Sequence, residues 1–417
     1  MDIKRDFYLN KLIQREGNSL IKVITGIRRC GKSYLLLNLF HNYLLDKGID
    51  ETHIIEVALD DRVNLDLRNP DNMLRYVKSR ITDSNRFYII LDEVQLMDEF
   101  VDVLNSLLHV RNADVYVTGS NSKFLSYDII TEFRGRGDEI HVYPLNFREF
   151  VSAHTGNTDE AWDDYYNYGG LPLVLSYQQP EEKQEYLLSL MQKVYISDIL
   201  ERHSIRNKEE LDELVDILAS GIGSLTNPTK LSRAFQSLKN KAISNNTLKT
   251  YIDYLEDAFL ISKVKRYDIK GKKYIGSPMK YYFEDVGLRN ARLNFRQTEE
   301  NHIMENIIYN ELRCRGFHVD IGIVNAFGKN TSNKTTKTTL EVDFVATRGS
   351  RKYYVQSAFN VDNSDKAAQE QRPLQKIGDS FKKIIVVKDN IKIHRNEDGI
   401  ATIGIYNFLL DENSLDL

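Results

Sequence analysis

The sequence predicts an α/β fold with a parallel sheet in its first part, followed by two smaller mixed modules. Three observations support this prediction. Short β-rich runs alternate with helical patterns over roughly the first 150 residues, as in parallel sheets with crossover helices. A glycine-rich loop joins an apolar run to a helical pattern within residues 21–45. Beyond residue 208, three helical patterns precede a hairpin, and further strands follow a long helix.

Composition limits the possible classes of protein. The chain has 417 residues, 41% hydrophobic and 28% charged, which is typical of a soluble globular protein with several domains. Its two cysteines cannot build a disulfide framework, and they suit a reducing cytosol. The start of the chain has no apolar segment, and no apolar run approaches the length of a membrane span. We therefore expect a cytoplasmic protein with no membrane partner.

The first part of the chain contains the pattern of a parallel sheet. Five strands are predicted, at residues 22–25, 53–58, 87–91, 115–118 and 140–143. A helix with an apolar face is predicted at residues 33–46, ending near Gly48. Residues 147–206 are mostly helical in pattern, with an interruption at Gly169-Gly170-Leu171-Pro172.

The later modules have a different order of elements. Three helices (211–222, 229–238, 245–258) and a hairpin (260–267, 273–284) have the layout of a winged helix. The last part predicts a helix at 302–315 and strands at 317–323, 339–346, 352–358 and 383–387. The polar run 328–339 is predicted to be a mobile loop. The predicted domains are residues 1–150, a helical lid or linker at 151–207, a winged helix at 208–290, and 291–417.

The glycine-rich loop fits the phosphate-binding P-loop pattern G-x-x-x-x-G-K-[ST]. Its glycines let backbone N–H groups approach phosphate oxygens at a helix N-terminus. Lys32 can reach the β- and γ-phosphates, and the Ser33 hydroxyl can ligate Mg²⁺. The pattern predicts ATP and Mg²⁺ as ligands, with these candidate residues: Gly26, Ile27, Arg28, Arg29, Cys30, Gly31, Lys32, Ser33 and Tyr34.

Less specific interpretations of this loop stay open. The loop could be a glycine-rich turn that contains Lys-Ser by chance. Arg28 and Arg29 could contact phosphate or face solvent. Cys30 lies near a helix N-terminus, which lowers the pKa of a thiol, but it also suits the role of a small filler.

A segment with two carboxylates follows the P-loop at residues 86–95, where an apolar strand ends in Asp92-Glu93. Asp92 can hold Mg²⁺ opposite Ser33, and Glu93 can orient and deprotonate the water that attacks the γ-phosphate. An ordinary acidic turn at a strand end is the alternative. Its position about 60 residues after a P-loop favours the catalytic interpretation.

Two further candidates lie after the fourth predicted strand. Asn121, or Ser120 as second choice, could hydrogen-bond the γ-phosphate or the attacking water, although Ser120 could equally cap the next helix. Arg136, in a basic turn before the fifth strand, could complete the site of a neighbouring subunit. A solvated basic turn is the alternative for Arg136.

Taken in order, TGIRRCGKS, IILDEVQ, VTGSNSKFL, GRGDEIHVYPLNFREF, GGLP and LEVDFVA resemble a family of prokaryotic AAA-type ATPases. In that family the C-terminal domain of unknown function contains a winged helix and a degenerate PD-(D/E)xK nuclease-like fold. The resemblance implies a sheet of strand order 5-1-4-3-2, a sensor role for Asn121 and a finger role for Arg136. It also implies the roles given above for Lys32, Ser33, Asp92 and Glu93.

The middle of the chain is basic. Between Asn227 and Lys280 twelve basic residues face four acidic ones, a net charge of +8 in a chain of −4. Such a module is typical of nucleic-acid contact, and duplex DNA is the expected partner. The alternative is a protein-binding module with solvated lysines. The candidate contact residues are Lys249, Lys263, Lys265, Arg266, Lys270, Lys272 and Lys273.

The last part has an incomplete nuclease pattern. Glu305 and Asp343 are suitable metal ligands, but the (D/E)xK position contains Gln356 and Ala358, so a carboxylate and the lysine are missing. We therefore expect a remnant that binds nucleic acid or protein rather than an active nuclease.

The leading hypothesis is an AAA-type ATPase that couples its nucleotide state to domain rearrangement and binds DNA. The alternatives are a nucleotide-switched signalling or scaffold protein without DNA binding, and an ATP-regulated nuclease. A finger arginine implies a homo-oligomer or a partner protein.

Overall fold

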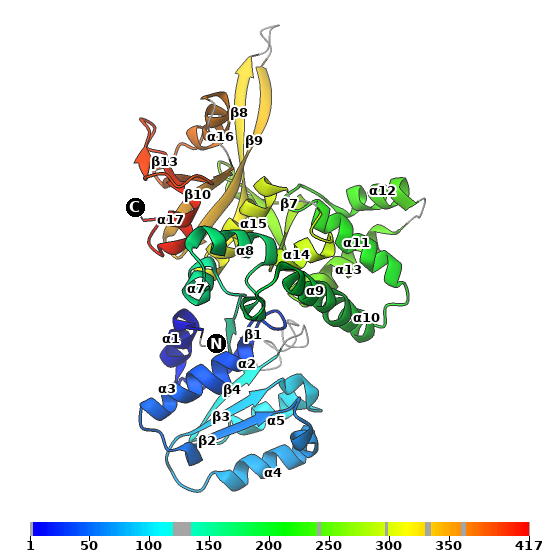
Figure 1. Ribbon diagram of the computed structural model, residues 1–417, viewed down its shortest axis with the longest axis vertical. Helices are drawn as coiled ribbons and strands as arrows, with labels where there is room; N and C mark the ends of the chain where they lie inside the picture. The colour runs from blue at the N-terminus through cyan, green and yellow to red at the C-terminus, as the bar shows by residue number, and fades with distance from the viewer. Residues whose placement is uncertain are drawn as a thin grey trace. The chain divides into compact units, whose positions relative to one another are not determined.

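The computed structural model describes residues 3–119, 135–239, 243–296, 299–329, 335–359 and 364–416 (Figure 1). Contacts divide the chain into two units. The first unit consists of Met1–Pro144, Leu171–Ser176 and Asp257–Phe259, and the second of Leu145–Gly170, Tyr177–Glu256 and Leu260–Leu417. Each unit is described by itself below.

The first unit is built on a parallel sheet of five strands. These are β1 (Ile21–Thr25), β2 (Ile54–Ala58), β3 (Phe87–Asp92), β4 (Ala113–Thr118) and β5 (Gly137–His141). Their order is β2-β3-β4-β1-β5, which confirms the order that the family resemblance implied. The strand boundaries differ from the sequence prediction by at most three residues. Parallel pairing places the carboxyl ends of all five strands at one edge of the sheet.

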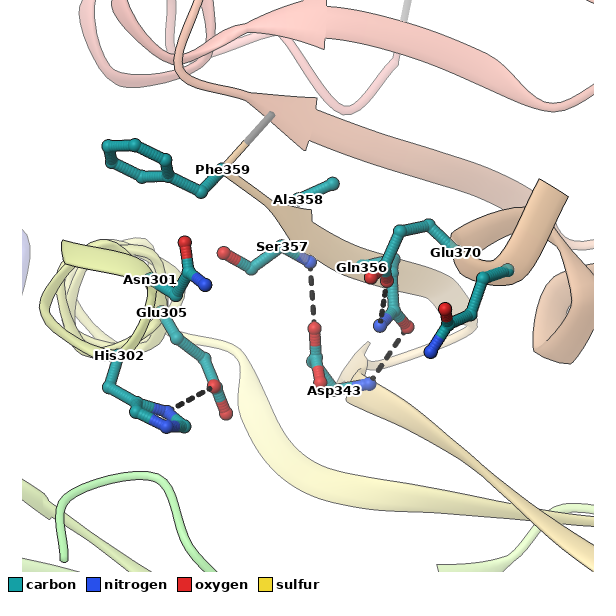
Figure 2. Close-up of a pocket in the computed structure, with 10 residues that line it drawn as sticks. Asn301, His302, Glu305, Asp343, Gln356, Ser357, Ala358, Phe359 and Glu370 are labelled. Atoms are coloured by element: carbon teal, nitrogen blue, oxygen red, sulfur yellow. Dashed lines mark hydrogen bonds and ion pairs between the residues drawn. The ribbon is translucent and has the colours of Figure 1, made fainter. Parts of the chain in front are cut away.

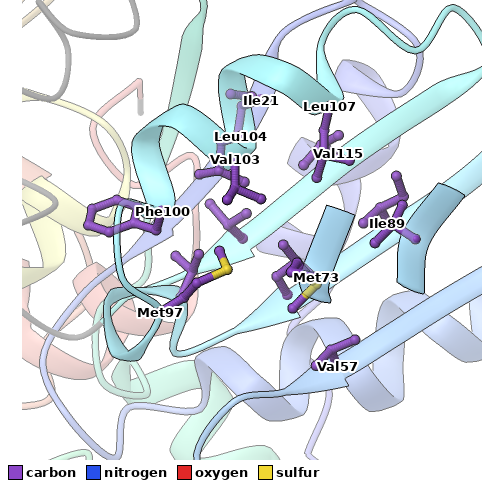
Figure 3. Packing of buried hydrophobic residues seen from close by; sticks show 14 of the residues in the cluster. Ile21, Val57, Met73, Ile89, Met97, Phe100, Val103, Leu104, Leu107 and Val115 are labelled. Carbon is purple, nitrogen blue, oxygen red and sulfur yellow. The ribbon is translucent and has the colours of Figure 1, made fainter. Parts of the chain in front are cut away.

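Helices cover both faces of this sheet. Helices α4 (Pro70–Arg80) and α5 (Phe100–Leu107) cover one face, where Met73, Val103 and Leu104 pack against alternate strand residues (Figure 3). The other face is covered by the continuous helical stretch of α2 (Lys32–Tyr34), π-helical η1 (Leu35–Phe40) and α3 (His41–Asp46). Phe40 of this stretch packs against the rings of Tyr88 and Tyr116. Its burial fixes the start of the helix, and with it the preceding loop, at the carboxyl edge of the sheet.

The second unit begins with helices. They are α7 (Phe147–Ala153), α8 (Thr158–Tyr168), α9 (Pro180–Leu190), η7 (Met191–Ile196), α10 (Ser197–Arg202), α11 (Lys208–Ser220), α12 (Pro228–Lys239), α13 (Asn245–Asp257) and α14 (Val286–Arg292). The predicted interruption at Gly169 follows α8 directly, with a φ of 75°. The side chain of Asp285, the N-cap of α14, accepts a hydrogen bond from the backbone N–H of Gly170.

An eight-stranded mixed sheet forms the rest of the second unit, in the order β12-β13-β11-β10-β9-β8-β6-β7. The strands are β6 (Ile261–Asp268), β7 (Lys273–Phe283), β8 (His318–Lys329), β9 (Thr335–Arg348), β10 (Arg351–Ala358), β11 (Lys382–Val387), β12 (His394–Arg395) and β13 (Ala401–Gly404). The predicted hairpin, β6–β7, pairs through β6 with β8. One hydrogen-bonded sheet therefore runs across the predicted domain boundary at residue 290, and that boundary stays a prediction.

Helices complete this part of the unit, and one prediction for it is wrong. Helices α15 (Glu300–Cys314), α16 (Ser364–Gln375) and α17 (Ile405–Leu410) accompany the sheet. The run 328–339 was predicted to be a loop, but β8 and β9 pair as far as Lys329 and Thr335, forming a long ribbon (Figure 1). Threonine favours strands, and backbone pairing does not need an apolar face, so polarity alone was a poor guide. Residues 330–334 lie outside the described chain.

A search of the described residues finds no helix that is both long enough and apolar enough to cross a membrane.

Candidate functional site

The glycine-rich loop leaves β1 at the carboxyl edge of the first sheet. Gly26, Arg29 and Gly31 have positive φ values of 137°, 66° and 101°. A Cβ atom on Gly26 would lie 2.1 Å from the carbonyl oxygen of Val142, so only glycine fits there. A Cβ on Gly31 would meet no atom closer than 3.6 Å, so its glycine serves the backbone conformation rather than tight packing.

The side chain of Arg5 fixes this loop by hydrogen bonds to backbone carbonyl oxygens. Its guanidinium donates to the carbonyl oxygens of Cys30 at 2.9 Å and Tyr143 at 2.7 Å. Cys30 is buried, and its thiol donates to the Val142 carbonyl at 3.2 Å. The loop is therefore tied to the segment after β5. Nothing in the sequence pattern around Arg5 pointed to this role.

The other loop candidates differ in exposure. Ile27 is fully buried, Arg28 and Tyr34 are half-buried, and Arg29 is exposed. Lys32 is only 4% exposed, and its ammonium donates to the carbonyl oxygens of Gly26 and Ile27, each at 3.0 Å. An ammonium has three N–H donors, so the third can donate to an anionic partner such as a phosphate oxygen.

Asp92 lies at the end of β3, next to the start of the helix that follows the loop. Its Oδ1 accepts a 3.1 Å hydrogen bond from the Ser33 hydroxyl and another from the Thr118 hydroxyl. Burial raises the pKa of Asp92, and the two hydroxyl hydrogen bonds oppose that rise. A hydroxyl oxygen beside a carboxylate oxygen is a hard donor pair of the kind that Mg²⁺ prefers. Ser33 and Asp92 therefore fit a magnesium ion that also binds nucleotide phosphates.

Glu93 follows in a left-handed backbone conformation, with a φ of 53°. Its backbone N–H donates to the Thr118 hydroxyl at 2.9 Å, and its carboxylate accepts from the Gln95 amide. Glu93 is half-buried, so its carboxylate remains within reach of water. Thr118 thus fixes both acidic residues at once. The sequence showed Thr118 only as the end of a strand, and its role was missed.

The outcome differs for the two remaining predicted residues, Asn121 and Arg136. Asn121, together with Ser120, lies outside the described residues. Arg136 is exposed and directly precedes β5, whose first residue pairs with Ile21 at the start of β1. Because the loop follows the end of β1, Arg136 lies at the opposite edge of the sheet. It cannot reach the loop of its own chain.

Comparisons with known proteins agree with this geometry. Residues 18–151 match a family described as AAA domain, and residues 159–299 match a domain of unknown function. An uncharacterized protein of Haemophilus influenzae is 31% identical over 414 residues, covering 98% of each chain. The chain belongs to the family of this protein. The match over residues 18–151 shows that this chain contains an AAA-type ATPase domain.

Two more distant similarities extend this comparison. An uncharacterized protein of Methanocaldococcus jannaschii is 28% identical over 420 residues, covering 97% of this chain and 87% of that protein. Among solved structures, a Walker-type ATPase of Pyrococcus abyssi is 16% identical, with a TM-score of 0.49. The match covers 70% of this chain and 96% of that one.

A second group of polar residues lies in the second unit, around a pocket of about 530 Å³ (Figure 2). The structure brings together the three predicted residues Glu305 of α15, Asp343 of β9 and Gln356 of β10. Asp343 Oδ2 accepts from the Ser357 N–H at 2.8 Å, and the Gln356 amide donates to Glu370 of α16 at 2.9 Å. The lining also includes Asn301, His302, Ala358, Phe359 and Gln369.

Sequence reasoning missed two members of this second group. Glu370 lies on α16, a helix that was not predicted. Lys280 of β7 was counted among the basic residues of the middle module, but its side chain is buried against carboxylates. Its only signal in the sequence was a lysine next to the aromatic end of a strand.

The seven candidate DNA-contact residues fall into two groups. Five are exposed: Lys249, Lys265, Lys270, Lys272 and Lys273. Lys263 instead pairs with Glu256 at 2.6 Å and Asp253 at 3.4 Å, and half-buried Arg266 donates to the Ser277 carbonyl. Lys249 lies on α13 and Lys265 within β6, whereas Lys270, Lys272 and Lys273 lie at the β6–β7 turn.

Proposed function

We propose that this protein hydrolyses ATP at the P-loop of its AAA-type domain and uses the nucleotide state to rearrange its domains. Lys32 would bind the β- and γ-phosphates, and Ser33 with Asp92 would hold Mg²⁺. Glu93 would act as the general base, with Asn121 as the sensor of the γ-phosphate. Bound Mg²⁺ would neutralise charge that develops on the transferred phosphoryl group.

One observation carries this proposal: the hydrogen-bond chain from Ser33 to Asp92 to Thr118 to the backbone of Glu93. It joins the helix after the loop to the ends of β3 and β4. These hydrogen bonds fix the carboxylate of Asp92, which would hold the metal, while the carboxylate of Glu93 keeps a separate position. This division of roles is what water attack on a γ-phosphate requires.

The test uses two substitutions with different expected results. Lys32→Ala should lose ATP binding, whereas Glu93→Gln should bind ATP and fail to hydrolyse it. Nucleotide binding is measured with a fluorescent ATP analogue, and turnover by phosphate release. Normal turnover in Glu93→Gln would reject the assignment of the base.

Arg136 can serve only a neighbouring chain, because it lies at the sheet edge opposite its own loop. Mixing inactive Arg136→Ala with inactive Glu93→Gln should then restore part of the activity. Mixed oligomers contain some interfaces with an intact Arg136 facing an intact Glu93. Full activity of Arg136→Ala as a monomer would remove this role.

Two short segments of later sequence belong to the first unit. They are Leu171–Ser176 and Asp257–Phe259, and Phe259 is the second residue after α13. The Phe259 ring lies 4.7 Å from His141, whose Nδ1 is 3.1 Å from the hydroxyl of Thr25. Thr25 is the last residue before the loop. These contacts, all within the first unit, connect Phe259 with the residue that precedes the loop.

We further propose that the module of α11, α12, α13 and the β6–β7 hairpin is a winged helix that binds duplex DNA. The order of elements supports this, as does a short bridge between Thr226 and Met279 that adds a third strand position. The exposed amino end of α13 would face a major groove, and the lysine-rich turn would contact phosphates. ATPase rates with and without duplex DNA, at low and high salt, test this proposal.

One observation favours the second candidate, a nucleotide-switched scaffold without DNA binding. Lys280 is buried and paired with Glu305, which lies outside the module, so the exposed charge of the module is smaller than its sequence charge of +8. Absence of any DNA effect on the ATPase rate at low salt would favour this candidate.

For the last part of the chain we propose a nuclease-like fold, and its sheet and helices, α15 with β8 to β11, support this proposal.

A further inference from the structure

The buried ammonium of Lys280 lies among three carboxylates next to the pocket of the second unit. Its Nζ is 2.7 Å from Glu305 Oε1, 2.8 Å from Glu341 Oε1 and 3.8 Å from Asp343 Oδ1. Lys280 is 4% exposed, and Glu305 and Asp343 are 7% and 8% exposed. These partners come from β7, α15 and β9, so the contact joins three elements.

Other polar groups complete the surroundings of this cluster. The Tyr282 hydroxyl donates to Glu305 Oε1 at 2.5 Å, and His302 Nδ1 lies 3.5 Å from Glu305 Oε2. Asp343 Oδ2 is held by the Ser357 N–H, on the side away from the ammonium. Figure 2 shows Glu305 and Asp343 directed into the same space from α15 and β9. The carboxylate of Glu370 lies beyond Gln356.

Charge balance explains why the lysine is there. Two buried carboxylates, Glu305 and Asp343, lie beside the partly exposed Glu341, and such a group is costly without a cation because a buried charge is costly when unpaired. Burial by itself would lower the pKa of Lys280, but the charges of Glu305, Asp343 and Glu341 outweigh it and raise that pKa. The lysine therefore remains charged and supplies the neutralising cation.

A divalent ion at this position would need the same oxygens. Metal-dependent phosphodiester cleavage requires carboxylate oxygens that converge on Mg²⁺. Within the described ranges, no three His, Cys, Asp or Glu side chains converge in a way that could hold a metal ion. Glu305 Oε1 and Glu341 Oε1 converge instead on the ammonium.

We propose that Lys280 is the resident cation of this site, occupying the place that a divalent metal ion would take among Glu305, Glu341 and Asp343. Oxygens of all three carboxylates thus already face a cation. They fasten the β6–β7 hairpin to α15 and β9 through Lys280. Removal of the ammonium leaves these carboxylates free to draw together around a divalent cation.

The test measures Mn²⁺ binding to the full chain without nucleotide, by the loss of the free-Mn²⁺ electron paramagnetic resonance signal. All proteins carry Ser33→Ala, which removes a ligand of the separate magnesium position at the P-loop. Lys280→Met should gain about one equivalent of bound Mn²⁺ relative to the parent protein. The gain should vanish in Lys280→Met with Asp343→Asn. Lys263→Met is the matched control, because it removes another carboxylate-paired lysine of the same hairpin outside the pocket.

The outcomes decide whether the Lys280 ammonium or a metal ion occupies the native site. No binding by the parent, together with the gain in Lys280→Met, supports the proposal. Mn²⁺ binding by the parent that Asp343→Asn abolishes would overturn it, because metal and lysine would then coexist. A folded Lys280→Met variant that binds no Mn²⁺ would also overturn it. If Lys280→Met does not fold, the comparison of the parent with its Asp343→Asn variant still decides whether the native site takes a metal.

Discussion

The two carboxylate sites of this protein differ in what neutralises them. At the P-loop, Asp92 is hydrogen-bonded by two neutral hydroxyls, from Ser33 and Thr118. In the second unit, Glu305 accepts from the ammonium of Lys280. Hydroxyls hold a carboxylate in place but leave its charge uncompensated, so the site can still attract a divalent cation. An ammonium satisfies that charge permanently. A cluster of acidic residues therefore does not identify a metal site until its neighbours are known.

The largest effect should appear in the catalytic turnover of Glu93→Gln. Glutamine retains an acceptor for Gln95 but cannot take a proton from water, so hydrolysis should fall about 10²- to 10⁴-fold while ATP binding persists. Single-turnover phosphate release measures the loss. Glu99→Gln, an exposed carboxylate in the same segment, serves as the control and should remain close to wild type. A small loss in Glu93→Gln would mean that water is activated elsewhere.

The second prediction concerns the stability of the second site. Lys280→Met leaves three carboxylates without a buried partner, and we expect the free energy of unfolding to fall by about 3–5 kcal/mol. Urea denaturation measures this loss. The control Lys263→Met breaks a more exposed pair, which should cost about 1 kcal/mol or less. Equal losses for the two lysines would contradict the special position of Lys280.

The difference between the two sites also explains what the sequence could predict. The P-loop residues lie within one stretch of the chain, and Asp92-Glu93 follow an apolar strand, so local patterns were sufficient. The five strands followed from the same regularity, and the strand order that the family resemblance implied is confirmed. Arg5 and Thr118 could not be predicted, because their contacts join segments that only the folded sheet brings together.

The second site shows the same limitation more strongly. Its members lie on α15, β7, β9, β10 and α16, and no spacing in the sequence links Lys280 to Glu305 or Asp343. The prediction that this site lacks a lysine rested on Ala358, which occupies the lysine position of the local pattern. The pairing of β6 with β8 was not visible either, because strand register across a sheet depends on distant residues. For these reasons the hairpin was assigned to a separate module.

A third buried carboxylate sharpens the comparison through its pH dependence. Asp285 is buried, and burial raises its pKa from 3.8 to about 6 even though the backbone N–H groups of Gly170 and Leu288 donate to it. The folded state thus binds this proton more tightly than the unfolded state does. The resulting stability is fully present below pH 3.8 and is lost as the pH rises through about 6.

We therefore expect Asp285 to contribute a fall of about 2 kcal/mol in the free energy of unfolding between pH 4 and pH 7. Asp285→Asn should remove this part of the slope and be less stable than wild type at low pH, because the amide nitrogen faces an N–H donor. Urea unfolding at several pH values measures it. An unchanged slope would show that Asp285 titrates normally.

The smallest effect extends the comparison to lysines that differ in pairing. Lys249 is exposed on α13, whereas Lys263 is neutralised by Glu256 and Asp253. If α13 contacts DNA phosphates, Lys249→Ala should lower the slope of log affinity against log salt by about 0.9 and weaken binding to all sequences alike. Lys263→Ala should change that slope little, because a paired ammonium releases no counterion from DNA. Fluorescence anisotropy with a labelled duplex at several salt concentrations measures both. Equal slopes for Lys249→Ala and wild type would place any DNA contact away from α13, whereas a larger change in Lys263→Ala would mean that its ion pairs open on binding.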